Sequence, residues 1–514
     1  MGPASAAGRL WRAIERAIPV GSFARSVAVM GGGTGLSYAL VLAVSPIVTR
    51  LYTPPDFGLL GVYMSMVSMS LVFVSWRYEL AIPAPKEDTE ATSVLVLAMA
   101  LVVGTSAMIG GALWAIGGLI VDSLDAPELR PYLWLVPVNT LIGGVYAVLY
   151  SWCVRKKAFA AIARSKLSQA VGTITAHVGL GLLFGGALGL VVGHIVRWGG
   201  GSVTLFRDFW RDSAGCRKRI SLRGTLTMAS RYRRFPMFTV WSALLGNCGT
   251  QMPVLLLSAF FGSVPAGLYV LTGQVLWMPL NVVALAISQV FFSSASEASR
   301  GGKAITLTLR VFTRLVAVGT PFIMLLMVAA PEGFALLFGP KWTMAGVYAQ
   351  FLCPWLLLAF AVGPVTSLVY VLEHQHGELV FQACLLVGRV AALVMGGLLG
   401  DPVLAIALFG GVSAAMWFVY MLWLLHVSGN RPRDGLICLG KNLAATLPVL
   451  LPTAAAKLVF DTPLWVVGGA AISAAWAAVN VVRGLRRRDA TPPDAAGRQE
   501  MTPDASAPGV IAAR

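Results

Sequence analysis

The chain has 514 residues, of which 57% are hydrophobic and only 12% are charged, and its formal net charge is +17. A soluble protein of this length is expected to divide into several domains with charged surfaces, whereas apolar runs of about 18 or more residues recur along this chain, as in membrane helices. The positive charge lies in short tracts between those runs, where it orients helices in a bilayer. This placement argues against a nucleic-acid-binding protein.

The first 24 residues predict an amphipathic helix rather than a signal peptide. The sequence GRLWRAIERAI places Leu10, Trp11 and Ile14 on one helical face, with arginines beside them. Such a helix is too short to span a bilayer but suits a surface of anionic membrane lipids. We expect residues 1–24 to form a cytoplasmic segment that anchors the chain to the membrane.

The next stretch, residues 46–83, predicts a helical hairpin in the membrane. An apolar helix ends just before Pro54 and Pro55, and proline cannot continue a helix. A second apolar helix begins near Phe57 and ends at the charged pair Arg77 and Glu79. The hairpin therefore has a polar tip at one membrane surface and a charged base at the other.

A weaker copy of this hairpin occurs about 209 residues later, in residues 258–280. The shared positions are Tyr52, Gly58 and Leu59 in the first copy and Phe261, Gly267 and Leu268 in the second. Self-similarity at a fixed offset favours a duplicated helical unit. The sequence thus predicts two similar halves.

Fourteen apolar segments predict membrane-spanning helices. Their ranges are 25–49, 57–78, 91–119, 132–154, 167–184, 187–206, 236–259, 268–292, 311–338, 346–372, 379–400, 402–426, 443–459 and 463–482. We expect an all-α polytopic membrane protein with two pseudo-symmetric six-helix lobes and two C-terminal helices. The corresponding parts are the N-lobe (25–206), a basic cytoplasmic linker (207–235), the C-lobe (236–426), helices 13 and 14 (427–482) and a disordered cytoplasmic tail (483–514).

The distribution of cations predicts how these helices are oriented. If the N-terminus is cytoplasmic, 32 of the 39 Lys and Arg residues fall in segments on the cytoplasmic side and three fall in segments on the other side. Short loops rich in Lys and Arg remain in the cytoplasm. We therefore expect both termini in the cytoplasm.

Two arginines, Arg197 and Arg389, lie near the middle of predicted helices 6 and 11. An ionised side chain at that depth must face a cavity or an internal partner, because hydrocarbon cannot solvate it. The alternative role for each is a hydrogen bond that joins two packed helices. For Arg50, Arg77 and Glu79, near helix ends, the alternatives are gate residues or side chains that reach the headgroups or form an ion pair.

Further polar residues within the apolar spans act either as interhelical hydrogen bonds or as the lining of a polar lumen. They are Asn139, His177, His194, Asn247, Gln251, Gln274 and Asn281. No pattern predicts a catalytic centre, a metal site or a cofactor. A nucleotide-binding GxxxxGK[ST] motif is absent from the sequence, which argues against a self-contained ATP-driven pump.

Three motifs in order resemble the Wzx-type flippases, which are polysaccharide biosynthesis proteins of the multidrug/oligosaccharidyl-lipid/polysaccharide (MOP) exporter superfamily. They are TRLYTPPDFG…RYELAIP, QMPVLLLSAFFGSVPAGLY (251–269) and LFGPKWTMAGVYAQFLCPWLL (337–357). The resemblance implies two six-helix lobes around a central cavity in a bacterial inner membrane. It implies a transporter, not an enzyme, that moves an undecaprenyl-diphosphate-linked oligosaccharide to the periplasmic face, for O-antigen, capsule or exopolysaccharide synthesis. Implied partners are membrane lipids, a polysaccharide polymerase and the chain-length machinery.

With that cargo, Arg197, Arg389, Arg77 and Arg50 become candidate contacts of the diphosphate, since an arginine fork binds phosphate oxygens and keeps its proton. Many relatives carry a cation where Gln274 stands, so this chain departs from the family there. The alternatives are a lipid II or multidrug exporter of the same superfamily, or a membrane polymerase or ligase. Mid-span arginines have the wrong sign for cationic drugs, and the outer loop 121–131 is short for a catalytic domain.

Overall fold

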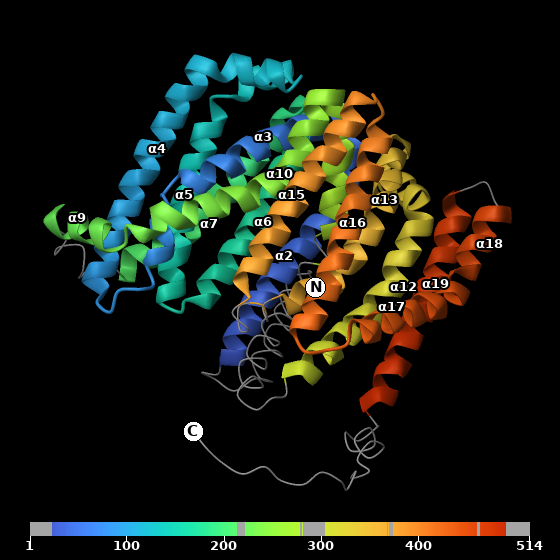
Figure 1. Ribbon diagram of the computed structural model, residues 1–514. Helices are drawn as coiled ribbons and strands as arrows, with labels where there is room; N and C mark the ends of the chain where they lie inside the picture. The colour runs from blue at the N-terminus through green and yellow to red at the C-terminus, as the bar shows by residue number, and fades with distance from the viewer. Residues whose placement is uncertain are drawn as a thin grey trace, which may run out of the picture.

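The computed structural model describes residues 23–212, 222–277, 304–366, 374–459 and 463–489, together with Leu280 and Val369. Within these residues the chain is built of α-helices joined by short turns and 3-10 segments, and no strand occurs in them (Figure 1). Twelve of the helices are long and apolar enough to cross a membrane. The predicted all-α polytopic membrane fold is confirmed.

Two of the fourteen predicted spans are not among those twelve. The sixth forms a 25-residue helix, but His194, Arg197 and three consecutive glycines lower its hydropathy. The eighth is helical over residues 263–277 and then continues into residues outside the described ranges. Residues 1–22 of the predicted amphipathic segment and residues 490–514 of the predicted disordered tail also lie outside them. Residues 483–489, at the start of that predicted tail, are helical.

The first half of the chain forms six long helices and two 3-10 segments. They are α2 (Phe23–Leu51), α3 (Pro54–Phe73), η1 (Tyr78–Ala81), α4 (Asp88–Ser123), η2 (Pro127–Tyr132), α5 (Leu135–Arg155), α6 (Phe159–Phe184) and α7 (Leu188–Asp212). Helix α6 packs along both α2 and α7, and α5 packs along α7. These helices therefore form one bundle, with α4 and α5 on its outer side (Figure 1).

The second half forms a similar bundle. Its elements are α9 (Leu222–Arg231), the π-helical turn η3 (Phe235–Thr239), α10 (Val240–Phe261), the helix over residues 263–277, α12 (Ala304–Phe338), η4 (Pro340–Trp342), α13 (Thr343–Val362), η5 (Gly363–Val365), α15 (Gln375–Leu398) and α16 (Pro402–Val427). The C-terminal elements are α17 (Pro432–Thr446), η6 (Leu447–Leu450), α18 (Leu451–Val459) and α19 (Pro463–Asp489). Helices α18 and α19 pack together and against α12, on the side away from the first half (Figure 1).

Three predicted element boundaries are wrong. Helix α3 begins at Pro54, not Phe57, because proline suits the first helical position and Asp56 caps the helix through the Thr53 backbone and hydroxyl. It ends at Phe73, because the backbone turns left-handed at Trp76 and Arg77. The predicted loop before span 13 is helix α17, which begins at Pro432 and ends at Thr446, directly before η6.

Each half has its own hydrophobic core, and a third core joins them. In the first half Tyr146, Trp152 and Val102 belong to one buried cluster, and in the second half Phe360 and Tyr420 belong to another. The joining cluster takes its members from both halves; they include Tyr52, Phe57, Tyr63, Leu257, Ala266 and Trp342. The halves are therefore held together at the end where α3 begins.

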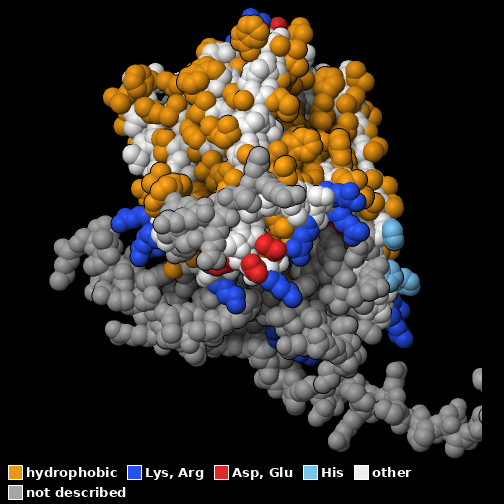
Figure 2. Space-filling model, turned by 90° about the vertical axis from the view of Figure 1, so that its left-hand side faces the viewer, with side chains coloured by type: hydrophobic (Ala, Val, Ile, Leu, Met, Phe, Trp, Pro, Cys, Tyr) orange, Lys and Arg blue, Asp and Glu red, His pale blue; other side chains and the backbone are white. Residues whose placement is uncertain are grey.

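The outer surface is strongly apolar. Trp114 is 91% exposed and Leu183 is 74% exposed, and many other large hydrophobic side chains are open. On the face in Figure 2, hydrophobic side chains cover the upper body while Lys and Arg gather below them. Large exposed apolar areas are stable in contact with lipid rather than water. The surface therefore suits a multi-pass membrane protein.

Candidate functional site

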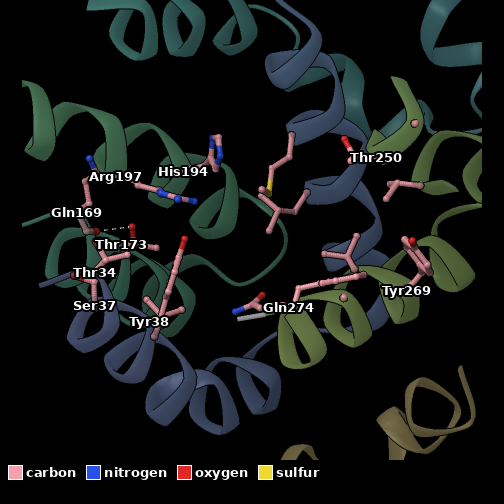
Figure 3. A pocket seen from close by; sticks show the side chains of 18 of the residues that line it. Thr34, Ser37, Tyr38, Gln169, Thr173, His194, Arg197, Thr250, Tyr269 and Gln274 are labelled. Atoms are coloured by element: carbon pink, nitrogen blue, oxygen red, sulfur yellow. Dashed lines mark hydrogen bonds between the residues drawn. The ribbon is translucent and has the colours of Figure 1, made fainter. Parts of the chain in front are cut away.

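A cavity of about 680 Å³ lies between the two halves. The first half lines it with α2, α3, α6 and α7, and the second half with α10, the helix over 263–277, α13, α15 and α16. Figure 3 shows Tyr38, His194 and Arg197 on one side, Thr250 and Tyr269 on the other, and Gln274 between them. The cavity is large enough for a small-molecule-sized headgroup.

The wall from the first half carries two cations. Arg197, near the middle of α7, lines the cavity and lies 5.4 Å from the centre of the Trp198 ring. Lys166 of α6 also lines it, and its ammonium lies 5.4 Å from the centre of the Tyr146 ring. Neither side chain pairs with a carboxylate in the described part of the chain. Both charges therefore remain available to a ligand.

The wall from the second half carries the third cation, Arg389 of α15. Its Nε donates a hydrogen bond of 2.9 Å to Ser413 Oγ, and its guanidinium lies 4.4 Å from the centre of the Trp355 ring and 5.2 Å from that of Phe409. These contacts hold the guanidinium in place through a hydrogen bond to an uncharged hydroxyl and through the faces of aromatic rings. Its positive charge is thus oriented but not neutralised.

No Asp or Glu is among the described residues that line this cavity. Three cations without a carboxylate partner give it a positive potential, and the apolar surroundings strengthen that potential relative to water. A second space of about 380 Å³ shares Gly249, Thr250, Gln382, Leu385 and Arg389 with the first and is lined also by Glu378. The Glu378 carboxylate there accepts hydrogen bonds from Tyr420 and Gln382.

Three predicted polar residues, His177, His194 and Gln274, line the cavity along with both mid-span arginines. Three others do not. Gln251 accepts a 3.0 Å hydrogen bond from Ser65 and so joins α10 to α3; Asn247 lies half-buried on α10; and Asn139 is fully buried inside the first half. Arg50 is exposed at the end of α2 and is also absent from the lining, while Asn281 lies outside the described residues.

Asn139 belongs to a buried network just behind the cavity wall. Its Nδ2 lies 3.0 Å from Tyr63 Oη and 2.7 Å from His194 Nδ1. Tyr63 Oη in turn donates to the Leu135 carbonyl oxygen at 3.1 Å. Because His194 also lines the cavity, this network fixes the ring of one wall residue through α3 and α5.

Arg77 and Glu79 form the predicted ion pair, with 3.5 Å between Arg77 Nη1 and Glu79 Oε1. Arg77 adopts a left-handed backbone conformation with φ of 63°, and Glu79, 6% exposed, also accepts a hydrogen bond from Ser75. The pair closes the corner between α3 and η1, away from the cavity lining. Its role as a gate stays a prediction.

We expect Glu79→Ala to destabilise the protein by about 1–3 kcal/mol, because the substitution leaves Arg77 and Ser75 without their acceptor. The measurement is the thermal unfolding midpoint of the purified protein in detergent. Glu128→Ala, which removes an exposed carboxylate, is the matched control and should leave the midpoint unchanged. Equal midpoints for Glu79→Ala and the wild type would show that the corner does not depend on this carboxylate.

At one end of the cavity the two copies of the hairpin motif meet. A Cβ atom on Gly58 would lie 1.9 Å from the Ser263 carbonyl oxygen, and one on Gly267 would lie 1.8 Å from the Pro54 carbonyl oxygen. Only glycine permits such backbone approach. The repeat found in the sequence thus forms a contact between the halves, and we call this contact the closed end.

The FGPKW motif reinforces the closed end. Lys341 Nζ donates to the Tyr52 carbonyl oxygen at 2.6 Å, and Trp342 Nε1 donates to the Thr49 carbonyl oxygen at 3.1 Å. The ring of Trp342, fully buried, also lies edge-on to Phe57 with 5.0 Å between centres. The three sequence motifs therefore meet in one place, where they hold the halves together.

A family model described as polysaccharide biosynthesis protein matches residues 47–346, which is more than half of the chain. The chain belongs to this family. Its matched region contains the closed end and most of the cavity wall from the first half. The predicted resemblance to Wzx-type flippases is therefore confirmed.

Two comparisons agree with this assignment. The succinoglycan biosynthesis transport protein ExoT of Rhizobium meliloti (strain 1021) is 25% identical over 442 residues, which cover 83% of this chain and 84% of ExoT. The solved structure of the lipid II flippase MurJ in an inward closed conformation matches with a TM-score of 0.66, covering 89% of this chain and 99% of MurJ. Its sequence identity is 11%, so that likeness shows the fold.

Another solved structure with some likeness is a multidrug resistance transporter of the MATE family and MOP superfamily in an inward-facing conformation. The match covers 78% of this chain and 95% of the transporter chain, with 12% sequence identity and a TM-score of 0.49. The relatives are transporters and flippases rather than enzymes. This polysaccharide biosynthesis protein is a multi-pass membrane transporter, and it has the fold of MurJ.

The sequence reasoning missed one cation of this polysaccharide biosynthesis protein, Lys166. The apolar run that predicts a span begins at Leu167, which places Lys166 in the preceding cytoplasmic loop. In the structure α6 begins at Phe159, and Lys166 lies two turns inside it, facing the cavity. The signal that could have found it is the helical register, since Lys166, Gln169, Thr173 and His177 share one face.

Proposed function

We propose that this transporter moves an undecaprenyl-diphosphate-linked oligosaccharide from the cytoplasmic to the periplasmic leaflet of a bacterial inner membrane by alternating access. The observation that carries the proposal is the cavity between the halves, with Lys166, Arg197 and Arg389 on its walls and no carboxylate among its described lining residues. Such a cargo has an anionic head, and about 30 Å of hydrocarbon separates the two leaflets. Cations in a shielded cavity stabilise that head halfway across.

The geometry also supports a conformational cycle. The halves meet through glycines and a shared apolar core at the closed end, and each half has a core of its own. Separate cores allow the halves to rotate as rigid bodies about the cavity. Closure at one end, with opening at the other, is the arrangement that alternating access requires.

The distribution of cations supports the direction. On the face in Figure 2, Lys and Arg gather below the apolar body. With Lys166 placed in the cavity wall, 31 of the 39 fall in segments that the positive-inside rule places in the cytoplasm. With that orientation the closed end faces the periplasm. An anionic head leaving an inside-negative cell gains about 2.3 kcal/mol per charge for each 100 mV, so the membrane potential favours export.

A lipid II cargo is the second candidate, because it carries the same diphosphate and the fold resembles that of MurJ. The positive charge of the cavity favours either diphosphate cargo over a cationic drug. Such a drug would meet three cations and no carboxylate among the described lining residues. A polymerase would need a catalytic centre outside the membrane. The two diphosphate cargoes differ in the glycan that they carry.

Deletion of the gene tests the proposal. We expect an undecaprenyl-diphosphate oligosaccharide to accumulate in the inner membrane while the matching surface polysaccharide is lost, measured by mass spectrometry of extracted lipids. Plasmid-borne wild-type protein should reverse both effects. Accumulation of lipid II instead would favour the second candidate, and an unchanged set of lipid intermediates would contradict both.

A further inference from the structure

The two walls of the cavity differ in chemistry. From α6 and α7 the first half contributes five polar residues, Lys166, Gln169, Thr173, His177 and Arg197, beside apolar residues such as Leu60 and Met64. Every tryptophan among the described lining residues comes from the second half. Figure 3 shows the polar side chains grouped around α6 and α7. This division is not explained by attraction of an anion alone, because that would require only the cations.

The polar wall has more hydrogen-bond donors than acceptors to pair with them. Gln169 is 3% exposed, and its Nε2 has no hydrogen-bond partner among the described residues. Lys166 and Arg197 line the same wall, and their side chains donate but never accept. A buried donor without an acceptor costs free energy unless a ligand supplies one. A diphosphate, which has several acceptor oxygens and negative charge, meets this requirement.

The aromatic wall is built in two layers. Trp355 and Phe409 are almost fully buried and pack edge-on, with 5.6 Å between ring centres. In front of them lie the half-buried rings of Trp277, 4.9 Å from Trp355, and Tyr269, 6.1 Å from Phe409. Edge-on packing on a buried layer fixes the orientation of the front rings.

Trp417 of α16 adds another half-buried ring to the same wall. Its orientation is held by edge-on contact with Phe381 at 5.7 Å and Tyr420 at 5.9 Å. Arg389 lies within this wall rather than opposite it, because its guanidinium covers Trp355 and Phe409. The wall thus combines fixed aromatic rings with one oriented donor group.

We propose that the two walls bind different parts of the cargo. The diphosphate is bound by Lys166, Gln169 and Arg197. The sugar rings next to it stack against Trp277, Tyr269 and Trp417. A pyranose ring has a face lined with C–H bonds, which packs on the negative face of an aromatic ring. Arg389, among those rings, donates to sugar oxygens. This inference rests on the proposed function, and it makes the aromatic wall the part that selects the glycan.

Binding to the full-length protein in lipid nanodiscs tests the division. The sugar-free probe is farnesyl diphosphate, and the glycan probe is the lipid-linked oligosaccharide extracted from the deletion strain. The variant Lys166→Gln/Arg197→Gln should bind both probes at least about tenfold more weakly, as expected for lost hydrogen bonds to a charged group. The variant Trp277→Leu/Trp417→Leu should bind farnesyl diphosphate like the wild type and the glycan probe about fivefold more weakly.

Conservative variants separate binding from folding. Lys166→Arg/Arg197→Lys keeps both charges, and Trp277→Phe/Trp417→Phe keeps two aromatic faces, so each should restore most of the corresponding affinity. An equal loss of affinity for both probes in the leucine variant would overturn this division of binding between the two walls. Unchanged affinity for farnesyl diphosphate in the glutamine variant would also overturn it. Wild-type protein that binds neither probe would contradict the proposed function itself, a result distinct from either of these.

Discussion

Replacing Arg197 and Arg389 together with glutamine should lower the rate of lipid-linked oligosaccharide translocation at least about a hundredfold. Arg197 donates to the anionic head and Arg389 to the sugar oxygens beside it. A hydrogen bond that involves a charged group is worth about 1.5–3 kcal/mol, and glutamine supplies neither the charge nor the fork. The two arginines lie on opposite walls, so the double variant removes a cation from each half. The measurement is transfer of the extracted lipid across the bilayer of proteoliposomes.

The matched control is Arg130→Gln. Arg130 of η2 is exposed and pairs with Asp122 at the end of α4 at 2.8 Å, and neither residue lines the cavity. Its loss should leave transport within about twofold of the wild type, because exposed ion pairs contribute little. Full transport by the Arg197/Arg389 variant, at equal amounts of folded protein, would show that translocation does not depend on these two side chains.

A second large effect is expected at the closed end. Gly58→Ala or Gly267→Ala places a Cβ atom less than 2 Å from a backbone oxygen of the other half, a contact that cannot be relieved by turning a side chain. The halves must separate there to accommodate the methyl group. We expect the closed conformation to be destabilised and transport to fall at least about tenfold.

Labelling of a cysteine in the cavity wall measures directly whether the closed end has opened. In a Gln274→Cys background, a membrane-impermeant maleimide applied from the side of the closed end should label the wall poorly, and adding Gly58→Ala should raise that labelling several-fold. Gly104→Ala is the matched control, since a Cβ atom at Gly104 meets no atom within 4 Å. Unchanged labelling in Gly58→Ala would mean that the glycine contact does not keep this end closed.

The helical membrane fold could be predicted from sequence because long apolar runs have few stable alternatives in a bilayer. The positions of Arg197 and Arg389 in the cavity lining follow from the same physics, since an ionised group in hydrocarbon needs a polar surrounding. The position of Lys166 in the cavity lining could not be predicted in this way, because an apolar run marks where a helix enters hydrocarbon and not where the helix begins. Helix α17 was missed for the same reason: Arg431, Arg433 and Asp434 resemble a loop in composition.

Contacts between the halves are harder to predict. The repeat in the sequence identified Gly58 and Gly267 as equivalent positions. It did not predict that each would contact the backbone of the other copy. Likewise Asn139 looks like a lumen residue by composition, and only tertiary packing shows that Tyr63 and His194 enclose it. Such partners are far apart in the chain and depend on the crossing of specific helices.

Tyr52 connects two features of the molecule that are otherwise separate. Its carbonyl oxygen accepts from Lys341 of the second half, while its hydroxyl donates to the His177 carbonyl oxygen at 2.7 Å, on a helix whose side chains line the cavity. Burial, with a smaller effect of Asp56, raises the pKa of Tyr52 to about 12, so this donor keeps its proton at neutral pH. A cargo that shifts α6 at His177 therefore alters the affinity of the two halves for each other. By thermodynamic reciprocity, separation of the halves must alter the affinity for the cargo by the same factor.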